Sequence, residues 1–178
     1  MFLSARRRKR EETIERLYGA IVAHARLPAF YRSFAVPDTI EGRFDLLILH
    51  VHLIFRRLAG AGEQYRRIGQ DVFDRFLADM DASLRELGVG DLAVPKRMRM
   101  MGEAFYGRAA VYDAAIAEAG DEALAVSLQR NVYANGAGAG EKAVRLASYT
   151  RMAVAALAVQ DVAAIASGAV EFPVPEED

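Results

Sequence analysis

Residues 39–59 read TIEGRFDLLILHVHLIFRRLA, and this stretch predicts a helix with apolar side chains on two sides. One broad stripe follows the helical spacing i, i+3, i+4 and i+7. It consists of Phe44, Leu47, Ile48, Val51, Ile54, Phe55 and Leu58. A second stripe, formed by Leu46, Leu49 and Leu53, lies on the opposite side. Two interpretations are open: the helix is the central one of a bundle, or its second stripe is exposed and binds a partner.

The apolar periodicity of the rest of the chain predicts five more helices. We expect them over about residues 14–25, 63–87, 94–119, 121–133 and 141–167. No stretch shows the sustained alternation of a β-strand, and no internal repeat is found. The sequence therefore predicts an all-α fold, a single bundle of about six helices.

The chain has a basic beginning and an acidic end, although its net charge is only -1. Arg6, Arg7, Arg8, Lys9 and Arg10 form one uninterrupted run. Such a cluster is attracted to an anionic membrane surface, so we expect these residues to contact one. The predicted organisation is a basic leader (1–10), a helical core (11–134), a glycine-rich linker (135–140), a C-terminal helix packed on the core (141–170) and an acidic tail (171–178).

Composition excludes several kinds of protein. A chain of 178 residues fits one domain with a real core. There are no cysteines, which excludes disulfides, thiolate metal sites and cysteine nucleophiles. The most apolar run without a charge, residues 152–159, is far shorter than the roughly 20 residues that a membrane-spanning helix needs.

Most enzyme interpretations fail on spacing. His50 and His52 lie two residues apart, about 200° around a helix, so they cannot bind one metal ion together. The glycine run that ends at Gly140 lacks the phosphate-loop pattern, because Glu141 separates it from Lys142. We therefore expect neither a metal nor another cofactor.

One enzymatic alternative remains. Asp71, Asp74 and Asp81 share one side of the predicted helix over residues 63–87, opposite its apolar stripe. Three carboxylates in this arrangement would suit magnesium in a helical enzyme that acts on a diphosphate. A solvated helix face is the favoured interpretation.

Asp79 differs from these three acids because it lies seven residues after Val72, on the apolar side of the same helix. A buried carboxylate needs a cationic partner. We expect a structural ion pair with Arg43 or Arg108.

Four separated motifs follow one another along the chain. They are Gly42-Arg43-Phe44-Asp45-Leu46-Leu47 with Leu49 and His50, Asp79-Met80-Asp81 with Leu84-Arg85-Glu86-Leu87-Gly88-Val89-Gly90-Asp91, Lys96-Arg97-Met98, and Phe105-Tyr106-Gly107-Arg108. In this order they resemble the ubiquinol-cytochrome c chaperone family, and the similarity extends over about residues 30–132.

The resemblance implies an all-helical chaperone, without catalytic activity, that binds newly made cytochrome b and assists its entry into ubiquinol-cytochrome c reductase. The short leader and the arginine-rich composition favour a bacterial member, cytoplasmic and peripheral at the inner membrane. For mitochondrial members it also implies a small partner protein and a position near the ribosomal tunnel exit, and both are left open for this chain. No nucleic-acid partner is expected, because the isoelectric point of about 6.3 is low for one.

A chaperone for cytochrome b should present an apolar surface bordered by charge. We expect Leu46, Leu49 and Leu53 to border a groove for an apolar helix of cytochrome b or another membrane protein. Arg97 and Met100 complete the predicted site, because Met100 points away from the apolar stripe of its helix and methionine adapts to irregular apolar partners.

Overall fold

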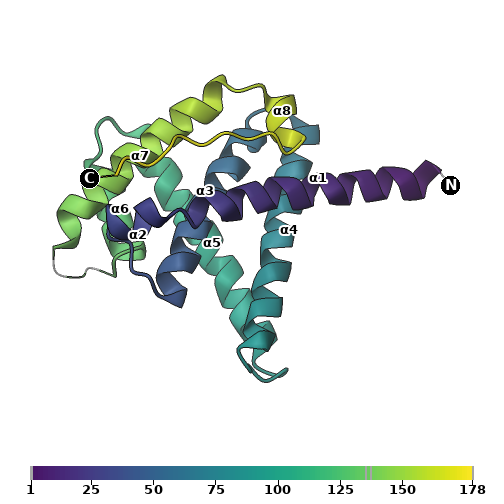
Figure 1. Cartoon of the computed structure of the whole chain (residues 1–178), viewed down its shortest axis with the longest axis horizontal. Coiled ribbons are helices and arrows are strands. Elements are labelled where there is room, and N and C mark those ends of the chain that lie inside the picture. Colours follow the sequence, from purple (N-terminus) through teal and green to yellow (C-terminus); the bar gives the residue numbers. More distant parts are fainter. Residues whose placement is uncertain (1, 135, 137, 178) are drawn as a thin grey trace.

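The computed structural model describes residues 2–134, 136 and 138–177, and every regular element in this part of the chain is a helix (Figure 1). The helices are α1 (Phe2–Ala25), α2 (Pro28–Arg32), α3 (Ile40–Ala59), α4 (Glu63–Glu86), α5 (Val94–Ala117), α6 (Glu122–Asn131), α7 (Ala139–Val159) and α8 (Val162–Ala166). Those with ten or more residues are α1, α3, α4, α5, α6 and α7. The predicted all-α bundle of about six helices is confirmed.

Two breaks produce the short helices that the periodicity did not predict. Pro28 is the first residue of α2, a position where its missing N–H is not needed. At the other end, Gln160 has an extended backbone and ends α7. The carboxylate of Asp161 then accepts a hydrogen bond from the N–H of Ala163 (3.0 Å) and begins α8. The single helix predicted over residues 141–167 is therefore two helices.

The glycine-rich segment that precedes α7 is only partly described. Asn135 and Ala137 of the predicted linker lie outside the described residues, and α7 already begins at Ala139. The role of this segment as a linker stays a prediction.

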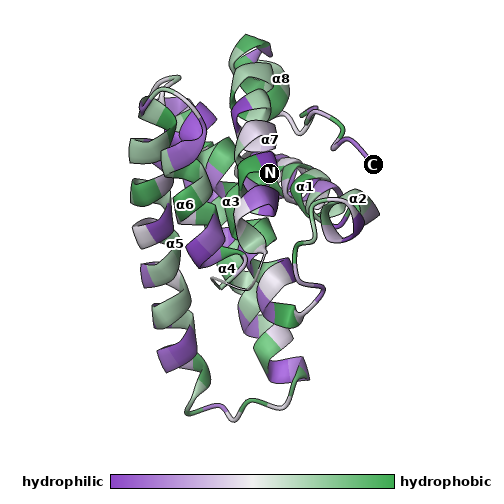
Figure 2. Ribbon diagram, turned by 90° about the vertical axis from the view of Figure 1, so that its left-hand side faces the viewer, coloured by the Kyte–Doolittle hydropathy of each residue, from purple (hydrophilic) through white to green (hydrophobic). Residues whose placement is uncertain are grey.

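Other helices surround α3, which lies in the middle of the bundle (Figure 2). It packs against α1, α4, α5, α7 and α8. Leu46, Leu49 and Leu53 are fully buried, so the interpretation of α3 as the central helix is confirmed. The expectation that these three leucines border an open groove is wrong. His50 lies on the same side of α3 and hydrogen bonds to Tyr149, which shows that α7 covers this stripe.

Three buried or half-buried polar side chains join α1, α3 and α7. The Nδ1 of His50 lies 2.8 Å from the carbonyl oxygen of Leu46, which can only accept, so Nδ1 carries the proton. The Nε2 of neutral His50 then accepts from the hydroxyl of Tyr149 (3.1 Å), and that oxygen accepts from the Nε2–H of His24 (2.7 Å). Phe172, from the extended C-terminal segment, stacks on His24 with ring centroids 4.7 Å apart.

Burial keeps both histidines of this cluster neutral. It lowers the pKa of His50 from 6.5 to about 3 and that of the half-buried His24 to about 4. The polar cluster is therefore part of the core at neutral pH.

The burial of the second stripe generates a stability prediction. We expect Leu49→Ala to lower the free energy of unfolding by about 2 to 5 kcal/mol, because it removes a fully buried side chain and leaves a cavity. Urea denaturation followed by circular dichroism measures the change. Leu92→Ala is the matched control, because Leu92 is 98% exposed and its loss should change little. Equal midpoints for the two variants would contradict the assignment of this stripe to the core.

The histidine cluster generates a pH prediction. In the unfolded chain His50 binds a proton below about pH 6.5, whereas in the folded chain it does so only near pH 3. Protons therefore favour the unfolded chain, and stability present above pH 6.5 is lost as the pH falls. Between pH 7 and pH 5 we expect the free energy of unfolding to fall by about 2 kcal/mol on account of His50.

Urea denaturation at several pH values tests this expectation. His50→Gln should be less stable at pH 7 but should lose less stability than the wild type on acidification. The same pH dependence in both proteins would show that His50 is not buried in the neutral form.

Candidate functional site

An apolar groove opens at the end of the bundle where the first turns of α3 and α5 approach the last turns of α1 and α4. Its volume is about 780 Å³. The apolar lining residues are Val22, Ala25, Ile40, Phe44, Leu47, Met80, Leu84, Leu87, Met100, Met101 and Ala104. The groove thus draws apolar side chains from four helices.

Large apolar side chains at the rim of the groove remain in water. Ile40 of α3, Leu87 at the end of α4 and Met100 of α5 are 64%, 60% and 56% exposed. Scattered exposed apolar residues are normal, but three around one opening indicate a binding surface.

The backbone at two helix ends positions this rim. At the start of α3, the hydroxyl of Thr39 accepts a hydrogen bond from the N–H of Gly42 (3.1 Å). A Cβ on Gly42 would lie 2.0 Å from the carbonyl oxygen of Pro37, so only glycine lets the preceding segment cross this turn. At the end of α4, Gly88 adopts a left-handed conformation (φ 78°) and stops the helix directly after Leu87.

Charged side chains of both signs border the apolar lining. They are Arg26, Arg43, Arg97, Glu41 and Glu86. Neither Arg26 nor Arg97 forms an ion pair with any carboxylate in the described part of the chain. The groove therefore offers cations to polar groups that flank an apolar ligand.

Only some of the residues predicted for the client site lie together in the structure. Arg97 and Met100 line the groove as expected, whereas the three leucines of the second stripe lie in the core. The sequence pattern did not predict Ile40 and Leu87 as part of this site. Both lie at helix ends, where the periodicity of apolar residues does not reveal exposure.

Asp79 does not form the predicted ion pair, because α4 directs this side chain toward α1. Its Oδ2 accepts a hydrogen bond from the hydroxyl of Tyr18 (2.8 Å), and its Oδ1 lies 3.7 Å from Nη1 of Arg75. The carboxylate is half-buried rather than enclosed. It contributes to the contact between α1 and α4.

The two arginines predicted as partners of Asp79 bind other acids. Arg43 donates to Asp38 (2.6 Å), just before α3, and Arg108 pairs with Asp45, which joins α5 to α3. Burial raises the pKa of Asp45 more than Arg108 lowers it. Spacing along the chain identified residues that need partners but not the partners themselves.

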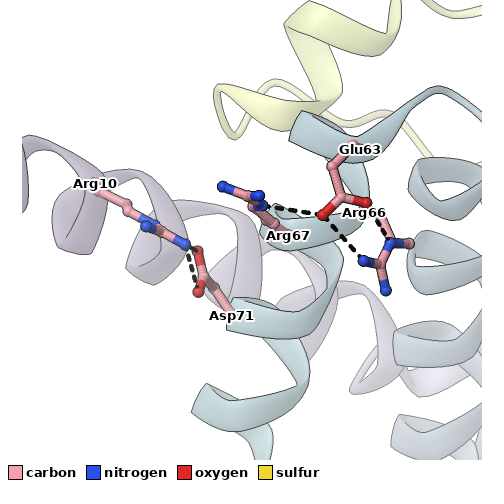
Figure 3. Close-up of polar contacts among 5 residues, drawn as sticks. All are labelled: Arg10, Glu63, Arg66, Arg67 and Asp71. Atoms are coloured by element: carbon pink, nitrogen blue, oxygen red, sulfur yellow. Dashed lines mark hydrogen bonds and ion pairs between the residues drawn. The ribbon is translucent and has the colours of Figure 1, made fainter.

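The three acids considered for magnesium each have another partner. Two hydrogen bonds from Arg10 reach Asp71, at 2.6 and 2.8 Å (Figure 3). Asp74 accepts from Gln70 (2.9 Å), and Asp81 pairs with Arg85 (2.6 Å). Within the described ranges, no three histidine, aspartate or glutamate side chains are arranged to hold a metal ion. The structure gives the magnesium interpretation no support.

The basic leader forms the first turns of α1 instead of a separate segment. Residues 6–10 are all exposed. No helix in the described part of the chain is both long enough and apolar enough to span a bilayer.

Comparisons with known proteins agree on one family. Residues 32–172 match the model of the family described as Ubiquinol-cytochrome C chaperone. The chain is 26% identical over 117 residues to ubiquinol-cytochrome-c reductase complex assembly factor 1 of Xenopus laevis. That match covers 66% of this chain and 58% of the relative, so the chain spans less than two thirds of the relative's length.

The fold is also found in a solved structure. The crystal structure of the Cbp3 homolog from Brucella abortus superimposes with a TM-score of 0.87 and 37% sequence identity, and each chain is covered completely. Because the family model matches most of the sequence and the fold agrees, this chain belongs to the ubiquinol-cytochrome c chaperone family.

Proposed function

We propose that this chain is an assembly chaperone for ubiquinol-cytochrome c reductase and that the apolar groove binds a membrane helix of newly made cytochrome b. The observation that carries the proposal is the ring of exposed apolar side chains around the groove. Covering apolar surface releases about 25 cal/mol per Å², so this rim favours an apolar partner. The description of the family as a chaperone supports a polypeptide as that partner.

A helix is the form of polypeptide that suits the site. Grooves between helices receive amphipathic or apolar helices through side chains at positions i, i+3, i+4 and i+7. A membrane helix satisfies its own backbone hydrogen bonds, so it needs only apolar cover until it enters the bilayer. An open groove supplies this cover without enclosing the client.

The side chains of the lining suit a client that must later be released. Met80, Met100 and Met101 are flexible and polarisable, so they adapt to different apolar surfaces. Each leucine-sized side chain that the groove buries contributes roughly 1.5 to 3 kcal/mol. A few such contacts give a transient complex. Arg26 and Arg97 are available for acidic or carbonyl groups that flank the bound segment.

A chaperone with this function must work where its client enters the membrane. We propose that it works in the cytoplasm, at the surface of the inner membrane. This location is consistent with the absence of a potential membrane-spanning helix from the described residues.

The groove generates a binding prediction. We expect Met100→Glu and Leu87→Glu each to weaken the binding of a fluorescent peptide carrying an apolar helix of cytochrome b by at least about tenfold, because the new carboxylate must lose water on binding. The free energy of unfolding should stay within about 0.5 kcal/mol of wild type, because both side chains are exposed. Fluorescence anisotropy and urea denaturation measure the two quantities.

The matched control is Val126→Glu on α6. Val126 is 69% exposed and does not line the groove, so this variant adds the same charge elsewhere. Should all three variants bind the peptide equally well, the groove is not the client site. Binding of a lipid but of no peptide would also reject the proposal.

A further inference from the structure

The first turns of α1 extend away from the other helices. Figure 1 shows α1 crossing α4 and continuing beyond it to the N-terminus. Residues 6–12 are exposed, and among the side chains of α1 that the structure describes, which begin at Arg6, the first buried one is Ile14. Residues 6–12, which we call the arm, therefore contribute little to the core.

Arg10 lies where the arm projects from the rest of the helical bundle. Its guanidinium donates to both carboxylate oxygens of Asp71 on α4 (Figure 3). One turn further along α1, Glu15 pairs with Arg75 (2.5 Å). Arg10 is thus engaged in holding the arm, so the cations offered to a partner are Arg6, Arg7, Arg8 and Lys9, which we call the arm cations.

The arm cations are weakly neutralised. Arg6 and Lys9 have no carboxylate partner among the described side chains. Arg7 and Arg8 pair with Glu11 (2.8 Å) and Glu12 (3.6 Å) one turn later. All these side chains are largely in water, where such pairs contribute little and exchange readily with other anions.

The basic surface continues onto the start of α4. Arg66 and Arg67 share the single carboxylate of Glu63 (Figure 3). Arg67 lies four residues before Asp71, hence on the same face of α4 as the residue that holds Arg10. Because two arginines share one carboxylate, these three residues carry a net positive charge close to the base of the arm.

We propose that the arm is a docking surface for an anionic lipid leaflet. The arm cations follow one another at about 100° intervals and so surround the helix. A diffuse cluster of this kind suits a charged surface, whose attraction does not depend on a particular face. Residues 6–12 contain no aromatic side chain that could stack on a base, and the isoelectric point of about 6.3 is low for a nucleic-acid-binding protein.

The arm and the groove share one continuous helix. Val22 and Ala25, at the other end of α1, line the groove. The helical rise separates Arg8 from this end by roughly 25 Å. Docking through the arm would therefore hold the groove within about one membrane thickness of the leaflet surface.

Vesicle flotation tests the proposal. The full chain should float with phosphatidylcholine vesicles that contain phosphatidylglycerol, and not with phosphatidylcholine alone. Replacement of all four arm cations by glutamine should reduce this binding at least about tenfold. Added salt should weaken binding of the wild type, because it screens exposed charges.

The control variant replaces Arg32, Lys96, Arg99 and Arg130 by glutamine, which removes the same charge from exposed positions outside the arm. It should float like the wild type. Equal flotation of the arm variant and the wild type would overturn the proposal, as would equal losses in both variants. Arm-dependent binding to an RNA oligonucleotide without binding to vesicles would also overturn it. The arm variant should bind the cytochrome b peptide normally, so this result is independent of the function proposed for the groove.

Discussion

Contact of α3 with α1, α4, α5, α7 and α8 buries the middle turns of this helix, from Leu46 to Ile54, and the arrangement of the other helices depends on that contact. A helix that is apolar on two sides cannot lie on the surface of a two-layer bundle without exposing one stripe. The broad stripe packs against helices that include α4, and the second stripe, formed by Leu46, Leu49 and Leu53, packs against α7. The polar contacts of His50 are satisfied within the same interface, by Leu46 and Tyr149.

The enclosure of α3 is incomplete at its first turns, and this gap in the packing explains the position of the groove. Ile40 is exposed and Phe44 is half-buried, whereas from Leu46 to Ile54 the helix is buried. The last turns of α1 and α4 and the first turns of α5 border this end of α3 without covering it. Core and groove are therefore two parts of one apolar surface, and they differ only in whether another helix of the chain covers them.

Sequence periodicity was sufficient for the fold because it reports which sides of a helix are apolar. It could not decide what covers each side. The stripe of Leu46, Leu49 and Leu53 was compatible with both a core and a binding surface until α7, about 100 residues later, was placed against it. The sequence pointed to Met100 because this residue departs from the apolar stripe of its own helix. Ile40 and Leu87 are exposed because they lie where helices end, and periodicity does not predict exposure at helix ends.

The sequence also could not predict which residues the charged and polar side chains contact. Spacing placed Asp79 on the inner side of α4 but could not show that Tyr18, 61 residues earlier, faces it. The pairing of His24 with His50 through Tyr149 likewise depends on three helices. The basic run at residues 6–10 was visible as composition, yet only the structure separates Arg10, which holds the arm, from the four cations before it.

The central proposal is that the groove binds newly made cytochrome b, and site-specific photo-crosslinking tests it most directly. A photoreactive amino acid would replace Met100 in one protein and Val126 in another, two exposed apolar positions inside and outside the groove. Crosslinks would then be analysed while cytochrome b is synthesised. The account predicts a crosslink to cytochrome b from position 100 and none from position 126. A crosslink from position 126 with none from position 100 would contradict it.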